Sequence, residues 1–242
     1  MESNSPDYSY KNVIQLESTD SKKFMSNVFL WMFIALSISA AAAYFFATSE
    51  NLIKLLVDFD TGRTTLWGKV AMFSPIAFVL IMSFGINKLS YSALSFLFIA
   101  YATVTGISLS FILLAYTASS VLGCFITASL LFGVMAVAGY TTNQDLTKFG
   151  SILIMLLVGI VIASIVNFFL GSDQLGYIIS FVGVAVFVGL TAYDVQKLKR
   201  ISEGIEYGDA SSKKTALMGA LTLYLDFINM FLFLLRLFGR RK

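Results

Sequence analysis

The sequence contains no histidine and a single cysteine among its 242 residues. Without histidine, it lacks the side chain that titrates near neutral pH and most often binds metal ions. Because Cys124 is alone, neither a disulfide framework nor a cysteine-based zinc site can form within the chain. We interpret Cys124, which lies in an apolar run, as a small buried or lipid-facing residue.

Charge is also scarce. Only 13% of the residues are charged and 57% are hydrophobic, whereas about a quarter of an ordinary soluble domain is charged. A soluble chain of this length could not bury so much apolar surface, but a bilayer solvates it, and the mean hydropathy is +0.81. The net charge of +3 comes without a clustered basic stripe, so no nucleic-acid partner is expected.

Apolar runs of bilayer length predict seven transmembrane helices. The absence of an alternating pattern excludes a barrel, so the predicted fold class is an all-α membrane protein. We interpret residues 1–22 as a flexible polar cytoplasmic tail and residues 23–242 as one seven-span domain. The expected spans are approximately 24–47, 68–86, 92–116, 119–139, 149–170, 176–197 and 216–238.

Small residues repeat along two of these spans and predict helix-packing faces. Ala102, Gly106 and Ser110 form such a stripe in the third span, and Ser37 and Ala41 form a shorter one in the first.

Lysine and arginine in the short loops predict a cytoplasmic N-terminus, mainly through the loop at 198–215. The final cluster of Arg240, Arg241 and Lys242 opposes this bias, because seven complete spans place it outside. Either the cluster is tolerated there or the last segment does not cross completely. We expect seven complete spans.

The sequence offers little support for an enzyme. Membrane serine proteases of the rhomboid type and HExxH metalloproteases both require histidine, and no phosphate-binding or dinucleotide fingerprint occurs. Aspartyl membrane proteases combine a YD pair with a GxGD motif. Tyr193-Asp194 supplies the first, but the second is missing, so we predict that the protein is not an enzyme.

Asp226 is the most unusual residue, because it interrupts the apolar run LTLYLDFINMFLFLL. A carboxylate in such a span costs at least ~2.5–3.5 kcal/mol and should face a partner or a cavity. Gly219, Thr222, Asp226 and Asn229 share one face of the predicted helix. This polar stripe favours an ion or proton site, with a purely structural hydrogen-bonding role as the alternative.

Asp194 lies near the end of the sixth span and shares a helix face with Thr191. The sixth and last spans are expected to be antiparallel neighbours, which brings the two aspartates towards each other. Hydropathy places Asp226 about ten residues, or ~15 Å, inside its span, deeper than Asp194. A direct pair therefore requires one helix to sit at a different depth than hydropathy suggests.

The segment VFVGLTAYDVQKLKR resembles the signature of the Bax inhibitor-1 family, also called the transmembrane Bax inhibitor motif family. The closing segment GALTLYLDFINMFLFLLRLFG is similar to the last helix of that family. Residues 101–106, Gly139-Tyr140 and Asp145-Leu146 also match, so the resemblance covers most of the chain from about 24 to 239.

The resemblance implies a last helix surrounded by the other six and a calcium leak gated by pH through two aspartates. These correspond to Asp194 and Asp226, which would bind Ca²⁺ transiently as the permeant ion, with no resident cofactor. Some members have a second-span arginine that latches onto the first aspartate. No arginine lies between Trp67 and Gly85 here, and only Lys69 and Lys88 flank that span.

The physics of paired carboxylates is consistent with this implication. Two carboxylates within hydrogen-bonding reach in a low dielectric do not both ionise readily, so they share a proton and titrate as one unit. When both are ionised, they form a hard oxygen site suited to a divalent cation. Protons and Ca²⁺ should therefore compete for the site.

The sequence thus favours a pH-sensitive calcium leak channel. The alternative is a non-conducting membrane protein that modulates a membrane protease or stress-response partners. The expected surroundings are the lipid bilayer, Ca²⁺ and protons, with membrane-protein partners allowed. The short chain suggests a bacterial inner membrane.

Overall fold

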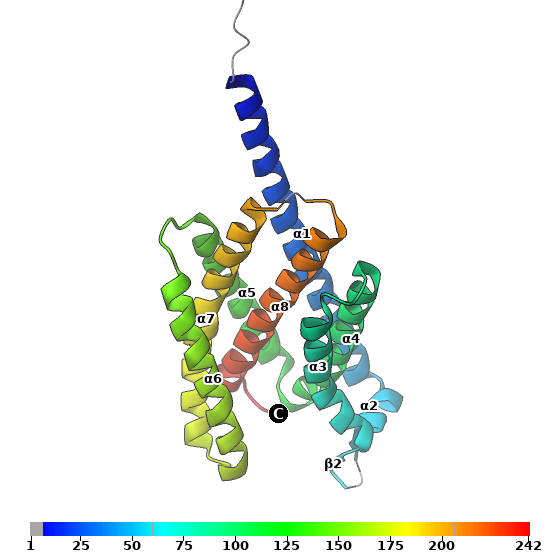
Figure 1. Cartoon of the computed structure of the whole chain (residues 1–242). Coiled ribbons are helices and arrows are strands. Elements are labelled where there is room, and N and C mark those ends of the chain that lie inside the picture. The colour runs from blue at the N-terminus through cyan, green and yellow to red at the C-terminus, as the bar shows by residue number, and fades with distance from the viewer. Residues whose placement is uncertain (1–6, 60, 206) are drawn as a thin grey trace, which may run out of the picture.

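The computed structural model describes residues 7–59, 61–205 and 207–242, with side chains from Thr19 onward. The described residues form a bundle of helices with one two-stranded hairpin (Figure 1). The elements in chain order are α1 (Asp7–Thr48), α2 (Glu50–Leu56), β1 (Val57–Asp58), β2 (Arg63–Thr64), α3 (Leu66–Gly85), α4 (Tyr91–Ala115), α5 (Ala118–Thr141), α6 (Thr147–Leu170), α7 (Asp173–Glu203) and α8 (Ala210–Phe238).

Seven of these helices are long and apolar enough to cross a membrane, which confirms the predicted all-α membrane fold and its seven spans. Helix α7 continues six residues past the expected end at 197 to Glu203, and α8 begins at Ala210 rather than 216. Polar residues extend both helices beyond their apolar runs, and hydropathy does not predict these extensions because it detects only the apolar part of a helix.

The N-terminal boundary also differs from the prediction. Helix α1 begins at Asp7, so residues 7–22 are helical rather than part of a flexible tail. The segment from Asp7 to Thr48 contains neither glycine nor proline, and nothing in it interrupts the helical backbone once the span has formed. Residues 1–6 of the expected tail lie outside the described residues.

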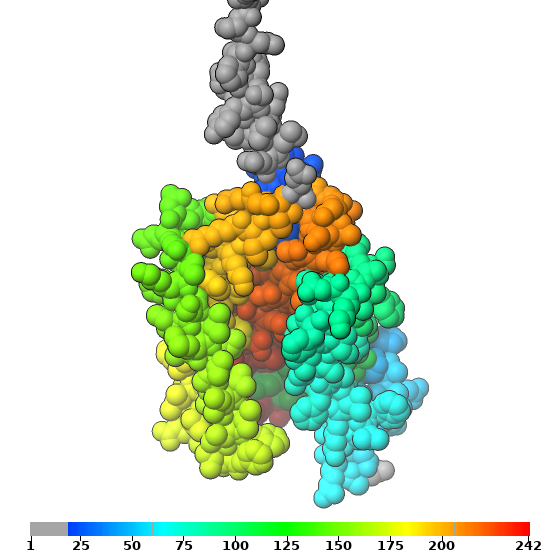
Figure 2. Space-filling model, viewed as in Figure 1, coloured from blue at the N-terminus to red at the C-terminus, as the bar shows by residue number. Residues whose placement is uncertain are grey.

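Helix α8 is the most buried span: 67% of its most apolar window is buried, against 11% for α6. It packs extensively on α1, α4, α5 and α7. The complete ring of six helices implied by the resemblance is not confirmed, because α3 packs mainly on α4, and α6 on α7. The space-filling view shows the surface hollowed between α6 and α3, with α8 behind (Figure 2).

The two small-residue stripes have different outcomes. The stripe of Ala102, Gly106 and Ser110 is buried, as predicted, and a Cβ on Gly106 would overlap the backbone of Ser39. The prediction for Ser37 and Ala41 is wrong, because both are exposed. The packing face of α1 instead carries three residues with the same spacing, namely Ala35, Ser39 and Ala43.

The α7–α8 loop and the first turns of the α1 span meet at one end of the bundle. The hydroxyls of Ser21 and Ser202 are 2.6 Å apart, and the Asn27 amide donates to the Tyr207 hydroxyl. The C-terminus lies at the other end, where the Thr117 amide donates to the Arg240 carbonyl at 3.0 Å. Helix α8 therefore runs from the end that holds the α7–α8 loop towards the opposite end of the bundle (Figure 1).

Candidate functional site

A cavity of about 800 Å³ lies among α3, α6, α7 and α8. Its wall is mostly apolar and aromatic, and α6 supplies the longest side, from Ile154 to Phe169. Outer members of this wall are exposed; Phe73 of α3, for example, is 64% exposed. In a bilayer such surface faces lipid, so the cavity is reached from the side between α3 and α6.

Asp194 and Asp226 both line this cavity. They are 9% and 4% exposed and lie close enough to each other for their charges to interact. Oδ2 of Asp226 is nevertheless buried without a hydrogen-bond partner among the described residues. A buried polar atom left unpaired is costly, so this oxygen marks a position where a proton or a cation would be stabilised.

The packing of α7 on α8 accounts for this meeting, because both helices extend by six residues at the same end and the relative depths of the aspartates are unchanged. Because α7 continues to Glu203, Asp194 lies about nine residues, or ~13 Å, inside its helix and not in its last turn. Gly219 is in close contact with Leu198 of α7, and a Cβ there would lie 2.6 Å from a Leu198 methyl group. The glycine thus allows α8 to approach α7 just beyond the aspartates.

The predicted supporting stripe is present only in part. Thr222 and Asn229 line the cavity beside Asp226, and each also donates to a carbonyl of its own helix, to Met218 at 3.2 Å and Leu225 at 2.8 Å. Thr191 is completely buried, donates to the Phe187 carbonyl at 2.8 Å, and is not among the lining residues. Thr191 therefore does not line this cavity.

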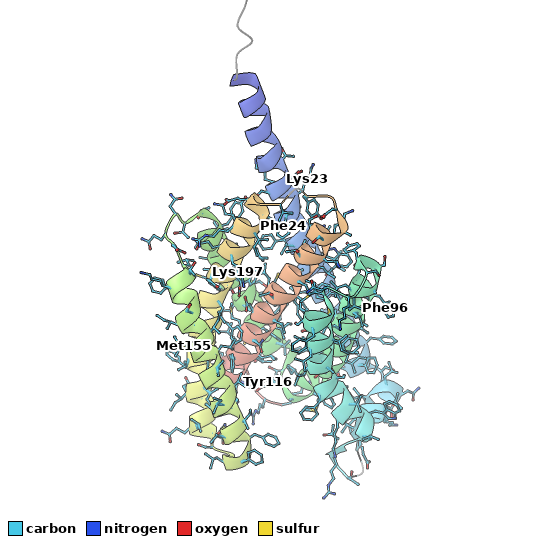
Figure 3. The ribbon with its side chains drawn as sticks, viewed as in Figure 1. Lys23, Phe24, Phe96, Tyr116, Met155 and Lys197 are labelled. Atoms are coloured by element: carbon cyan, nitrogen blue, oxygen red, sulfur yellow. The ribbon has the colours of Figure 1, made fainter. Side chains whose placement is uncertain are left out.

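Lys197 is a charged lining residue that the sequence did not lead us to predict as part of the site. It projects from α7 one turn beyond Asp194, with its ammonium 6.0 Å from the centre of the Tyr193 ring (Figure 3). Among the described lining residues it is the one cation. Its spacing of three residues from Asp194 could have indicated this position. Lys69 and Lys88, which flank the second span, are exposed and do not line the cavity.

Polar residues after Asp194 hold α7 against the α5–α6 loop. The Gln196 amide donates to the Gln144 carbonyl at 2.7 Å and its oxygen accepts from the Leu146 amide at 2.9 Å. Lys199 donates to the Tyr140 carbonyl at 3.0 Å. The segments around Tyr140 and Leu146 that resembled the family are therefore the ones that fix the helix carrying Asp194.

An exposed ion pair completes this attachment. Arg200 lies 2.8 Å from Asp145, whose carboxylate also accepts from the side chain and amide of Thr147. These hydrogen bonds, with a smaller contribution from Arg200, lower the pKa of Asp145 to about 2. In the part of the chain described here, no group of three or more Cys, Asp or Glu side chains could hold a metal ion.

The chain belongs to the Bax inhibitor-1 family: residues 21–242 match the family described as "Inhibitor of apoptosis-promoting Bax1". It is 45% identical over 220 residues to inner membrane protein YbhL of Escherichia coli strain K12, covering 90% of this chain and 92% of that one. A protein of Borreliella burgdorferi is 43% identical over 221 residues, covering 91% of this chain and 93% of its own. A membrane protein of Streptococcus pyogenes is 33% identical over 222 residues, covering 90% and 93%.

Proposed function

We propose that this protein is a pH-sensitive Ca²⁺ leak channel gated by Asp194 and Asp226. The observation that supports the proposal is the unpartnered Oδ2 of Asp226, buried beside a second carboxyl in a membrane-embedded cavity. A carboxyl that served only to join helices would be expected to have both oxygens paired.

The proposed gate follows from the charge of the pair. With one proton shared between the carboxyls, they attract each other and hold α7 against α8. Loss of that proton leaves two like charges in a low-dielectric cavity, which repel and attract a hard divalent cation. Ca²⁺ entry is then favoured as pH rises and opposed as pH falls, because proton and cation occupy the same oxygens.

The arginine latch implied by the family resemblance has no counterpart in α3. We propose that Lys197 balances part of the charge instead, from the same helix as Asp194. A cation on the same helix cannot tie α3 across the cavity, so closure should depend on the carboxyl pair alone.

We place the protein in a bacterial inner membrane with its N-terminus in the cytoplasm. Its Escherichia coli relative is described as an inner membrane protein, and the lysine and arginine residues of segment 198–215, at the end of α7 and the start of α8, support this orientation.

Ca²⁺ flux into liposomes containing the purified protein tests the proposal. We expect flux to rise with pH, and to fall at least about tenfold in Asp226→Asn, since the variant removes a charge that the ion contacts. Asp173→Asn is the matched control, because this exposed aspartate is at the other end of α7. The proposal fails if flux and its pH profile survive Asp226→Asn and Asp194→Asn alike.

The alternative function, modulation of membrane-protein partners without conduction, makes a different prediction for the same preparation. Folded wild-type protein would then carry no Ca²⁺ above empty liposomes at any pH, and Asp226→Asn would leave that background unchanged.

A further inference from the structure

The walls of the cavity are poorly suited to a hydrated metal ion alone. Such an ion requires oxygen ligands, whereas most of the lining is apolar, with aromatic rings from α3, α6, α7 and α8, including Phe73, Phe169, Phe187 and Phe233. The cavity volume of about 800 Å³ lies in the range of about 300–1,000 Å³ that holds drug-sized molecules. Its size and its walls are suited to an organic molecule.

The charged groups in the cavity indicate what kind of organic molecule fits. Asp194, Asp226 and Lys197 are the charged lining residues in the described part of the chain. With both carboxylates ionised, these groups carry one net negative charge, which a single positive charge neutralises. Oδ2 of Asp226 is buried, and no group among the described residues donates a hydrogen bond to it. Aromatic faces also attract cations through their quadrupoles.

The route into the cavity restricts the molecule further. Val161 and Ile165 on α6 line the cavity and are 50% and 56% exposed. The surface is hollowed between α6 and α3 (Figure 2). A molecule that dissolves in the bilayer can therefore reach the aspartates sideways, without crossing an aqueous entrance.

We propose that the cavity is a binding site for a lipophilic monovalent organic cation that enters from the bilayer. Its charge lies at Asp226 and Asp194, and its apolar body lies along α6 between α3 and α8. The inference deepens the proposed function, because it assigns a second class of ligand to the same carboxylates.

Tetraphenylphosphonium is a suitable probe, because it combines one positive charge with four phenyl rings. Equilibrium dialysis of the labelled cation against purified protein in detergent, at one fixed pH and without Ca²⁺, measures its affinity. Tetraphenylborate is the matched control, with the same shape and the opposite charge. We expect saturable binding of the phosphonium at a stoichiometry of one, and no saturable binding of the borate.

Two pairs of variants locate the site. Asp226→Asn should weaken phosphonium binding by about tenfold or more, since a charge-assisted contact is lost, whereas Asp173→Asn should leave it unchanged. Val161→Trp should fill the lateral opening and weaken binding, whereas Val158→Trp should not. Val158 is 54% exposed on the same helix but does not line the cavity. The Val161 pair leaves both aspartates intact, so it tests the site even if Asp226→Asn fails to fold.

Three results would each overturn the inference. The borate could bind as well as the phosphonium, Asp226→Asn and Asp173→Asn could bind the phosphonium with equal affinity, or retained phospholipid could exclude the phosphonium. The dialysis contains no Ca²⁺ and the flux assay contains no phosphonium. Absence of phosphonium binding with intact pH-dependent flux would overturn the inference alone, and the converse result would overturn the proposed function alone.

Discussion

Asp226 is buried on a helix whose neighbouring residues are almost all apolar, and one of its oxygens has no partner among the described residues. An ionised carboxylate in this position is costly unless it is paired. A shared proton with Asp194, or a bound cation, removes that cost. The two carboxyls should therefore behave as one unit with two alternative occupants.

This coupling predicts that losses of function in the pair are not additive. The double variant Asp194→Asn/Asp226→Asn should lose no more than about twofold in Ca²⁺ flux beyond the worse single variant, because residues in one network do not contribute independently. Flux measured against pH for the wild type, both single variants and the double variant decides this. Additive losses with unchanged pH midpoints would show two independent aspartates.

Asp145 provides a contrasting carboxylate outside the spans. Its pKa is lowered to about 2 by hydrogen bonds from Thr147 and by Arg200. A lowered pKa favours the ionised form, whose contribution is complete above the ordinary value of about 3.9 and is lost only as pH falls through about 2.

Asp145 therefore does not change charge between about pH 5 and 8. We expect Asp145→Asn to leave the pH midpoint of Ca²⁺ flux unmoved, even if the Arg200 contact is lost. A shifted midpoint in this variant, in the same liposome assay, would place the pH sensor at the α5–α6 loop instead of in the cavity.

Most of the polar site residues could be predicted because an intramembrane carboxylate and its helical neighbours stand out from an apolar sequence. Asp194, Asp226, Thr222 and Asn229 all line the cavity. Lys197 was missed because a cation near a helix end is ordinarily solvated, and Phe73 because an aromatic residue in a span carries no signal of its own. Whether Lys197 and Phe73 belong to the site depends on which helices enclose the cavity, and the sequence does not show that.

At the scale of the elements, the segment after Tyr193 has two roles. Asp194 lies on the cavity face, whereas Gln196 and Lys199 bind the carbonyls and amide of the chain between α5 and α6. Helix α7 also lies directly against α5, where Gly139 contacts the backbone of Ala192. The rigid contacts on one side of α7 keep Asp194 directed towards α8.

This close approach predicts a position-specific effect of a single methyl group. A Cβ on Gly139 would overlap the Ala192 carbonyl, whereas one on Gly133 of the same helix would meet nothing within 4 Å. Gly139→Ala should lower stability by about 1–3 kcal/mol through overpacking, and Gly133→Ala should be neutral or slightly stabilising. Thermal unfolding in detergent compares them. Equal midpoints would mean that α5 and α7 can separate without cost.

At the scale of the whole molecule, both the beginning of the α1 span and the α7–α8 loop lie at one end of the bundle, and the C-terminus lies at the other. Which end faces the cytoplasm is a prediction from lysine and arginine bias.

Cysteine labelling in intact cells tests that orientation in a Cys124→Ala background. A cysteine at Ser211 should be protected from an impermeant maleimide, because this exposed residue lies at the lysine-rich end. One at Thr61, exposed beside the β-hairpin at the other end, should react. The reverse labelling pattern would show that the protein has the opposite orientation, with the C-terminal basic cluster on the cytoplasmic side.

The sequence by itself determined the class of protein, the number of spans and the two aspartates. Each of these depends on local properties: the length of an apolar run fixes a crossing, and a carboxylate within one requires compensation. The sequence was less informative about which face of each helix packs against its neighbours. It indicated Ser37 and Ala41 as the contact face of α1, whereas Ala35, Ser39 and Ala43 pack inward.

Only the tertiary structure decided that Asp194 and Asp226 line one cavity, that Thr191 does not line it, and that the cavity lies among α3, α6, α7 and α8. Hydropathy measures depth along each helix separately and carries no information on how two helices pack, so it left the aspartates at different depths. The meeting depends on how α7 packs against α8, including the close approach at Gly219. These are properties of two helices packed together, which no single segment encodes.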